Sequence, residues 1–106
     1  MTTATLNAPT ATTATTPLVG GWTNFNFTLT DKAKKVFVLA FKGFVGVDYT
    51  PLAFATQVVA GTNWCFLAKG VVVYPGAPEM AALIYIYEPL EGNPHITDIE
   101  RIMPGQ

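Results

Sequence analysis

The 106-residue sequence has few charged residues, one cysteine and one histidine. Charged residues make up 12% of the chain, about half of the roughly 25% typical of soluble domains. So few charges leave apolar surface exposed, which favours a binding face or self-association. The net charge is −1, and the only basic cluster is Lys32, Lys34 and Lys35, which argues against nucleic acid as a partner. The single cysteine, Cys65, excludes an internal disulfide and favours a reducing compartment.

Targeting signals are also missing. The N-terminus has neither the basic nor the apolar region of a secretory signal. No apolar run approaches the ~18 residues that a membrane-spanning helix needs. We therefore expect a cytoplasmic protein without a membrane partner.

Groups suited to catalysis are scarce. Cys65 and His95 are the only candidates for a nucleophile and its base. Cys65 follows Trp64 in a strand pattern, where a free thiol usually serves as a small core residue, and His95 follows Pro94 in a loop. One cysteine and one histidine cannot form a zinc site. We expect no enzyme activity, no metal and no cofactor.

The chain divides into a tail and one domain. Residues 1–17 hold eight threonines, four alanines and no charge, a composition typical of disorder because it cannot bury enough apolar surface. Residues 18–106 are long enough for one domain with a single core.

The domain begins with a predicted strand over 22–29 and a predicted helix. Thr30 is placed to cap the helix and Asp31 to interact with its dipole. Apolar residues then recur at helical spacing as far as Phe44, and Gly43 and Gly46 are expected to end the helix. For Trp22, packing on the helix is favoured over an exposed position beside the N-terminal segment.

Four further strands are predicted, with 48–51 as a turn before the first of them: 52–59, 62–73, 81–87 and 95–102. The third is apolar on both faces, hence central, and the fourth is a charged edge. Ala53, Ala55 and Gln57 form the face on which a helix could pack closely. The prediction is an α+β fold, with one long helix across an antiparallel sheet of four to five strands.

Two short motifs resemble those of a known family. Gln57, Val58, Val59, Ala60 and Gly61, followed by Thr62-Asn63-Trp64, resemble the first inhibitory hairpin of the cystatins, which inhibit papain-like cysteine peptidases. Upstream, Leu18-Val19-Gly20-Gly21 resembles the N-terminal contact segment of the same family. With no disulfide, the chain is most similar to the intracellular, stefin-like branch. The resemblance runs from about Leu18 to the C-terminus and implies the cystatin fold.

The function that this resemblance implies is occlusion of a peptidase cleft by a wedge of three segments. Gly20 would let the trunk bend, Leu18 and Val19 would fill substrate pockets, and the hairpin would provide the central contact. The third segment would be the loop after the third strand. This loop lacks the tryptophan found in many secreted and plant cystatins, which predicts weaker binding to some targets. Its candidate contacts are Pro89, Leu90, Pro94 and His95.

One alternative stays open. The chain could be a non-inhibitory interaction or assembly module of the same fold. The resemblance implies a hairpin strained at Val59, which can open into a domain-swapped dimer and thereby abolish inhibition. The expected active form is the monomer.

Overall fold

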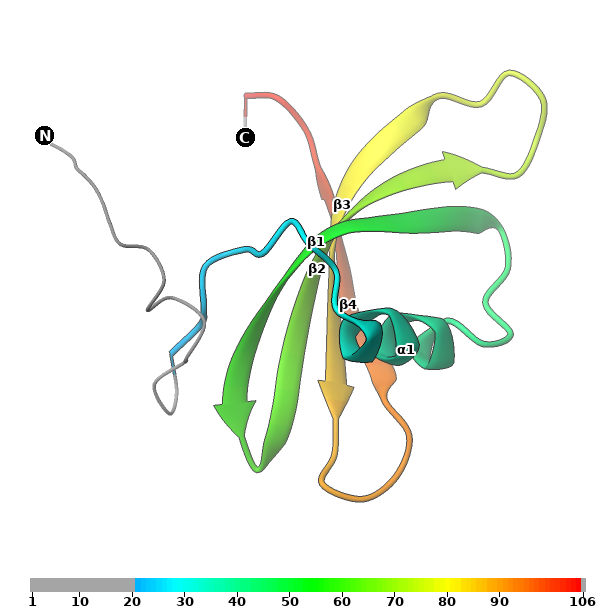
Figure 1. The fold of residues 1–106 in the computed structure, drawn as a ribbon. Coiled ribbons are helices and arrows are strands. Elements are labelled where there is room, and N and C mark those ends of the chain that lie inside the picture. Colours follow the sequence, from blue (N-terminus) through cyan, green and yellow to red (C-terminus); the bar gives the residue numbers. More distant parts are fainter. Residues whose placement is uncertain (1–20, 106) are drawn as a thin grey trace, which may run out of the picture.

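The computed structural model describes residues 21–105, which form one helix and a four-stranded sheet. The elements are α1 (Asp31–Ala40), β1 (Val47–Val59), β2 (Gly61–Val72), β3 (Glu79–Glu88) and β4 (His95–Ile102). The strands are antiparallel in the order β1-β2-β3-β4, and α1 lies across one face of the sheet (Figure 1). The predicted α+β class is confirmed. The expectations for residues 1–17 and for Leu18, Val19 and Gly20 lie outside the described residues.

The helix begins where the sequence predicts and ends earlier. The Thr30 hydroxyl accepts a hydrogen bond from the Ala33 amide at 3.0 Å, which satisfies a donor that the first turn leaves unpaired. The helix ends at Ala40, although the apolar pattern continues to Phe44. The rings of Phe41 and Phe44 lie 5.0 Å apart in the turn that follows. The apolar pattern therefore continues past the end of the helix because its last members pack against each other in this turn. No helix within 21–105 is long and apolar enough to cross a membrane.

The core lies between α1 and the face of the sheet that carries Phe54. The helix buries Ala33, Val36 and Phe37, and Phe37 packs edge-on against Phe66 with ring centroids 5.0 Å apart. The buried sheet residues of this core are Trp64, Phe66, Ala68, Ala82, Ile84 and Ile86. Phe54 packs against this cluster.

The prediction that the helix packs on the face of Ala53, Ala55 and Gln57 is therefore wrong. The opposite face offers neighbouring aromatic rings from β1 and β2, including Phe54 and Trp64 at 5.6 Å. Burying large aromatic side chains releases more apolar area from water than burying alanines does. The helix accordingly covers the aromatic face.

β1 is longer than predicted, because the expected turn over 48–51 is part of it. The pairing of β1 with β2 shifts between Pro51 and Ala53. Since β1 is an edge strand, a proline at this irregularity removes no hydrogen bond from the centre of the sheet. The predicted positions of β3 inside the sheet and of β4 at its edge are confirmed.

The predicted strand over 22–29 is not formed. This segment makes only two isolated antiparallel pairs with β1, Trp22 with Gln57 and Asn26 with Phe54. The two pairs lie four positions apart on this segment but three positions apart on β1, so a regular ladder cannot continue between them. Trp22 is 44% exposed and packs edge-on against Tyr85 at 6.1 Å. Its favoured placement on the helix is therefore wrong.

Candidate functional site

The topology brings two loops to the same end of the sheet. In an antiparallel meander, the first and third connections lie at one end and the second at the other. The β1–β2 hairpin and the loop 89–94 between β3 and β4 are accordingly neighbours at the lower end in Figure 1. The motif-bearing hairpin and the predicted third segment thus share one edge of the molecule.

The hairpin tip presents small apolar side chains to solvent. Ala60 is exposed, and Val58 and Val59 are 37% and 39% exposed. The left-handed backbone conformation lies at Gly61, with φ of 102°. Throughout 21–105, positive φ occurs only at glycines. Val59 therefore does not adopt the left-handed conformation that would strain its backbone.

Gly61 brings the hairpin into contact with the start of the second loop, because without a side chain its backbone can lie directly against Glu88 and Pro89. A Cβ at this position would lie 2.5 Å from the carbonyl oxygen of Glu88 and 3.2 Å from Cα of Pro89. The Tyr87 hydroxyl donates a hydrogen bond to the carbonyl of Ala60. The hairpin is therefore held against the end of β3 by both a close backbone contact and a hydrogen bond.

The second loop has one prominent apolar side chain. Leu90 is 82% exposed, whereas Pro89 is half-buried and Pro94 is buried. His95 is exposed and its ring lies 5.7 Å from that of Tyr87. Leu90 and His95 are thus accessible to a partner, while Pro94 supports the loop from within.

The described chain starts beside the hairpin. Gly21 precedes Trp22, which pairs with Gln57 at the end of β1. The side-chain amide of Asn63 donates a hydrogen bond to the side-chain oxygen Oε1 of Gln57 at 2.9 Å. This pairing places Gly21 on the same edge as the hairpin, and it is the one part of the predicted trunk that the structure describes.

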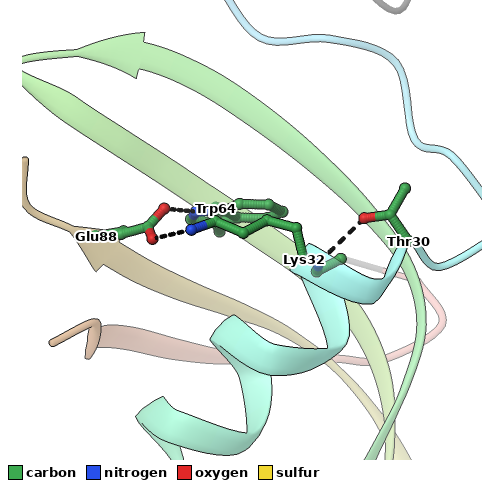
Figure 2. Close-up of polar contacts among 5 residues, drawn as sticks. Thr30, Lys32, Trp64 and Glu88 are labelled. Carbon is green, nitrogen blue, oxygen red and sulfur yellow. Dashed lines mark hydrogen bonds and ion pairs between the residues drawn. The ribbon is translucent and has the colours of Figure 1, made fainter.

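Glu88, the last residue of β3, links β2 to the helix, a role that the sequence analysis missed (Figure 2). One carboxylate oxygen accepts from the indole nitrogen of Trp64 at 3.1 Å, and the other binds the ammonium group of Lys32 at 2.7 Å. Trp64 is buried, so its N–H needs a partner within the protein. The signal available in the sequence was a single acidic residue at the end of an apolar strand.

Replacing Glu88 with alanine is expected to destabilise the fold by about 1–3 kcal/mol, because the buried indole N–H of Trp64 loses its acceptor. Urea unfolding, followed by circular dichroism, measures the effect. Glu79→Ala is the matched control, since the Lys69–Glu79 pair is exposed and 3.9 Å long and is worth about 0–1 kcal/mol. Equal losses for the two variants would contradict the role given to Glu88.

Cys65 is not placed for nucleophilic chemistry. It is 5% exposed and lies on the face of the sheet opposite α1. Burial raises the pKa of its thiol above the ordinary value of 9.0, a hydrogen bond with Tyr85 lowers it, and the charge of Glu100 raises it further. Burial is also the main cause that raises the pKa of the Tyr85 hydroxyl above 10.0. The prediction that Cys65 is a core residue is confirmed.

These shifts predict a loss of stability at alkaline pH. The folded state holds the protons of Cys65 and Tyr85 more tightly than the unfolded state does. The contribution of these two groups to folding stability is therefore complete below their pKa values in the unfolded chain. It is lost as pH rises through their raised pKa values in the folded protein. The free energy of unfolding should therefore fall between about pH 8 and about pH 11. Urea unfolding at both pH values measures the fall, which should be smaller for Cys65→Ala. An identical fall in that variant would contradict a role for the thiol.

No group of three or more histidine, cysteine or acidic residues that could hold a metal occurs in the part of the chain that the structure describes. No protein-family model matches the chain, and comparisons with curated proteins and with solved structures also return no match. The features of this chain that point to a function are therefore the two motifs and the geometry of the edge that carries the hairpin and the loop 89–94.

Proposed function

We propose that this protein is a reversible, tight-binding inhibitor of papain-like cysteine peptidases with a cystatin-like fold. One helix packed on a four-stranded antiparallel sheet is consistent with that fold. The hairpin and the loop 89–94 would enter the active-site cleft together and block access of substrate. Gly21 and the residues before it would form the remaining segment of the wedge.

The observation that carries this proposal is the contact of the hairpin with the second loop at Gly61. The backbone of Gly61 lies against Glu88 and Pro89 too closely for any side chain. Two loops fixed in this way lose little conformational freedom on binding, which favours high affinity. The Gln-Val-Val-Ala-Gly motif thus coincides with the position where the fold unites two exposed loops.

The exposed side chains of this edge suit a substrate cleft. Val58, Val59 and Ala60 are small, so the hairpin backbone could approach the walls of a narrow cleft closely. Leu90, at 82% exposure, would provide the largest apolar contact of the second loop in place of the absent tryptophan. Apolar anchors that fill pockets carry most of the binding energy in many interfaces.

The test is a titration of active papain with the purified full-length monomer, followed with a fluorogenic peptide substrate. We expect activity to fall in proportion to added inhibitor and to recover on dilution with excess substrate. A folded monomer that leaves papain and several related peptidases active at about micromolar concentration, where binding free energy would be about −8 kcal/mol, would contradict the proposal.

Exposed apolar surface away from this edge favours a second candidate, a non-inhibitory assembly module. Val45 is 85% exposed in the α1–β1 turn, and Val73 and Tyr74 are 62% and 61% exposed in the β2–β3 turn. The two turns are in contact, since the Val73 amide donates to the Gly46 carbonyl at 3.1 Å. Light scattering, run beside the papain titration, distinguishes the two candidates. A stable oligomer that does not inhibit papain would favour the assembly module.

A further inference from the structure

The face of the sheet opposite α1 carries a groove between aromatic and acidic residues. Cross-strand pairing places Cys65, Tyr85 and Asp98 side by side, and Leu83 beside Glu100. Paired residues of antiparallel strands point to the same face. The core against α1 includes Ile84, between Leu83 and Tyr85 in sequence, so these residues lie on the other side.

Trp22 forms one wall of this groove. Its indole stands edge-on to the ring of Tyr85, with an interplanar angle of 76°. The groove has a volume of about 430 Å³ and is bordered by Trp22, Tyr85, Asp98 and Glu100. A smaller hollow of about 190 Å³ continues from the same two aromatic residues over Ala55 and Cys65. The result is an open trough with an aromatic wall, an apolar floor and a carboxylate wall.

The two carboxylates are available to a cationic partner. Asp98 and Glu100 are exposed, and within 21–105 neither forms an ion pair. Lys69, on the same face, is paired with Glu79 at 3.9 Å. The charges of Glu100 and Asp98 contribute, after burial and Cys65, to the raised pKa of the Tyr85 hydroxyl. The trough is therefore electronegative.

We propose that this trough binds an arginine side chain of a partner protein. The planar guanidinium group can stack on the indole of Trp22 while its N–H groups bind the carboxylates, a combination that the lysine ammonium group cannot make. Asp98 and Glu100 are two residues apart on one strand, about 7 Å, which is a span that one guanidinium group and its stem can bridge. The first 20 residues contain neither lysine nor arginine, so that segment cannot supply the cation.

This inference is independent of peptidase inhibition, because it involves the open face of the sheet rather than the tips of the loops. An extended peptide that carries one arginine is the simplest partner that would fit this trough. Such a peptide would lie over β2 and β3, with its arginine between Trp22 and the two carboxylates of β4.

The test uses the full chain and the blocked peptides Gly-Gly-Arg-Gly-Gly, Gly-Gly-Lys-Gly-Gly and Gly-Gly-Glu-Gly-Gly. Nuclear magnetic resonance follows the indole N–H of Trp22, with the backbone amides of residues 73–78, in the turn between β2 and β3, as an internal reference. We expect saturable shifts at Trp22 with the arginine peptide, a response at least about threefold weaker with lysine, and none with glutamate. Equal responses to arginine and lysine, or none to either, would overturn the proposal.

Matched variants separate the trough from general electrostatic attraction. Asp98→Asn/Glu100→Gln and Asp48→Asn/Glu91→Gln each change the net charge from −1 to +1. The first pair should weaken binding of the arginine peptide at least about fivefold, or about 1 kcal/mol, and the second pair less than twofold. Trp22→Ala should also weaken it; in this variant, binding is followed at the backbone amides of Tyr85 and Asp98 because the indole is absent. Equal weakening by both pairs, or shifts that appear without peptide as protein concentration rises, would overturn the proposal.

Discussion

Replacing Gly61 with alanine is expected to be the most destabilising single change at the proposed inhibitory edge. Gly61 has φ of 102°, a conformation that costs other residues about 1–2 kcal/mol. The new methyl group would also overlap the Glu88 carbonyl, 2.5 Å away, and the Tyr87 hydroxyl, 2.9 Å away. We expect a total loss above about 3 kcal/mol, since the two loops must separate. Urea unfolding of the variant measures this loss.

Gly76→Ala is the control for backbone conformation alone. Gly76 also has a positive φ, 77°, but nothing lies within 4 Å of the position that its Cβ would occupy. This variant should lose only about 1–2 kcal/mol. If Gly61→Ala and Gly76→Ala lose the same amount, the close contact between the hairpin and the second loop is not what Gly61 provides.

Replacing Val59 with aspartate is expected to weaken papain inhibition at least about a hundredfold. When the hairpin enters the cleft, a carboxylate at its tip would leave water without gaining a cation or a hydrogen-bond donor as a partner. Burying an unpaired charge in this way is costly. A hundredfold change in affinity corresponds to about 2.7 kcal/mol, a modest fraction of that cost. Because Val59 is 39% exposed in the free protein, we expect little loss of folding stability. Inhibition constants and unfolding curves of the same preparation measure the two effects.

Val45→Asp is the matched control for this prediction. It makes the same chemical change in a valine that is 85% exposed and lies in the turn before β1, whereas the hairpin follows β1. Inhibition by this variant should equal that of the unmodified chain. A comparable loss in both variants would place the effect in overall charge or solubility rather than in the hairpin.

The sequence predicted most of the sheet because its strands either alternate or, for β3, are apolar on both faces, and because strong turn residues bound them. β4 begins and ends where the charged pattern over 95–102 predicts. The hairpin at Ala60-Gly61 is also where the two flanking patterns require it. For these elements, local pattern and tertiary packing favour the same structure.

The errors occurred where tertiary packing overrides local pattern. The alternation of Phe25, Phe27 and Leu29 is typical of a strand, but the segment has an extra residue relative to β1 and pairs only intermittently. Pro51 indicated a turn, although an edge strand tolerates proline at an irregularity. The choice of face for α1 depended on the aromatic side chains of two strands together, which no single segment reveals.

The proposed site was predictable only in part. The hairpin was located through its motif, and the second loop through its place in the order of elements. The contacts that join them were not, because Tyr87, Glu88 and Gly61 meet only after β2 and β3 have paired. Glu88 illustrates this point, since its two partners, Lys32 and Trp64, come from α1 and β2.

The most direct test of the central claim is hydrogen exchange of the full-length protein, alone and in excess papain whose catalytic thiol is blocked by a small methylthio group. If one edge occludes the cleft, exchange should slow in residues 57–61 and 89–94 together. Exchange in 73–78, at the other end of the sheet, should stay unchanged. Protection of 73–78 in place of the two loops, or no protection anywhere at saturating papain, would contradict the account.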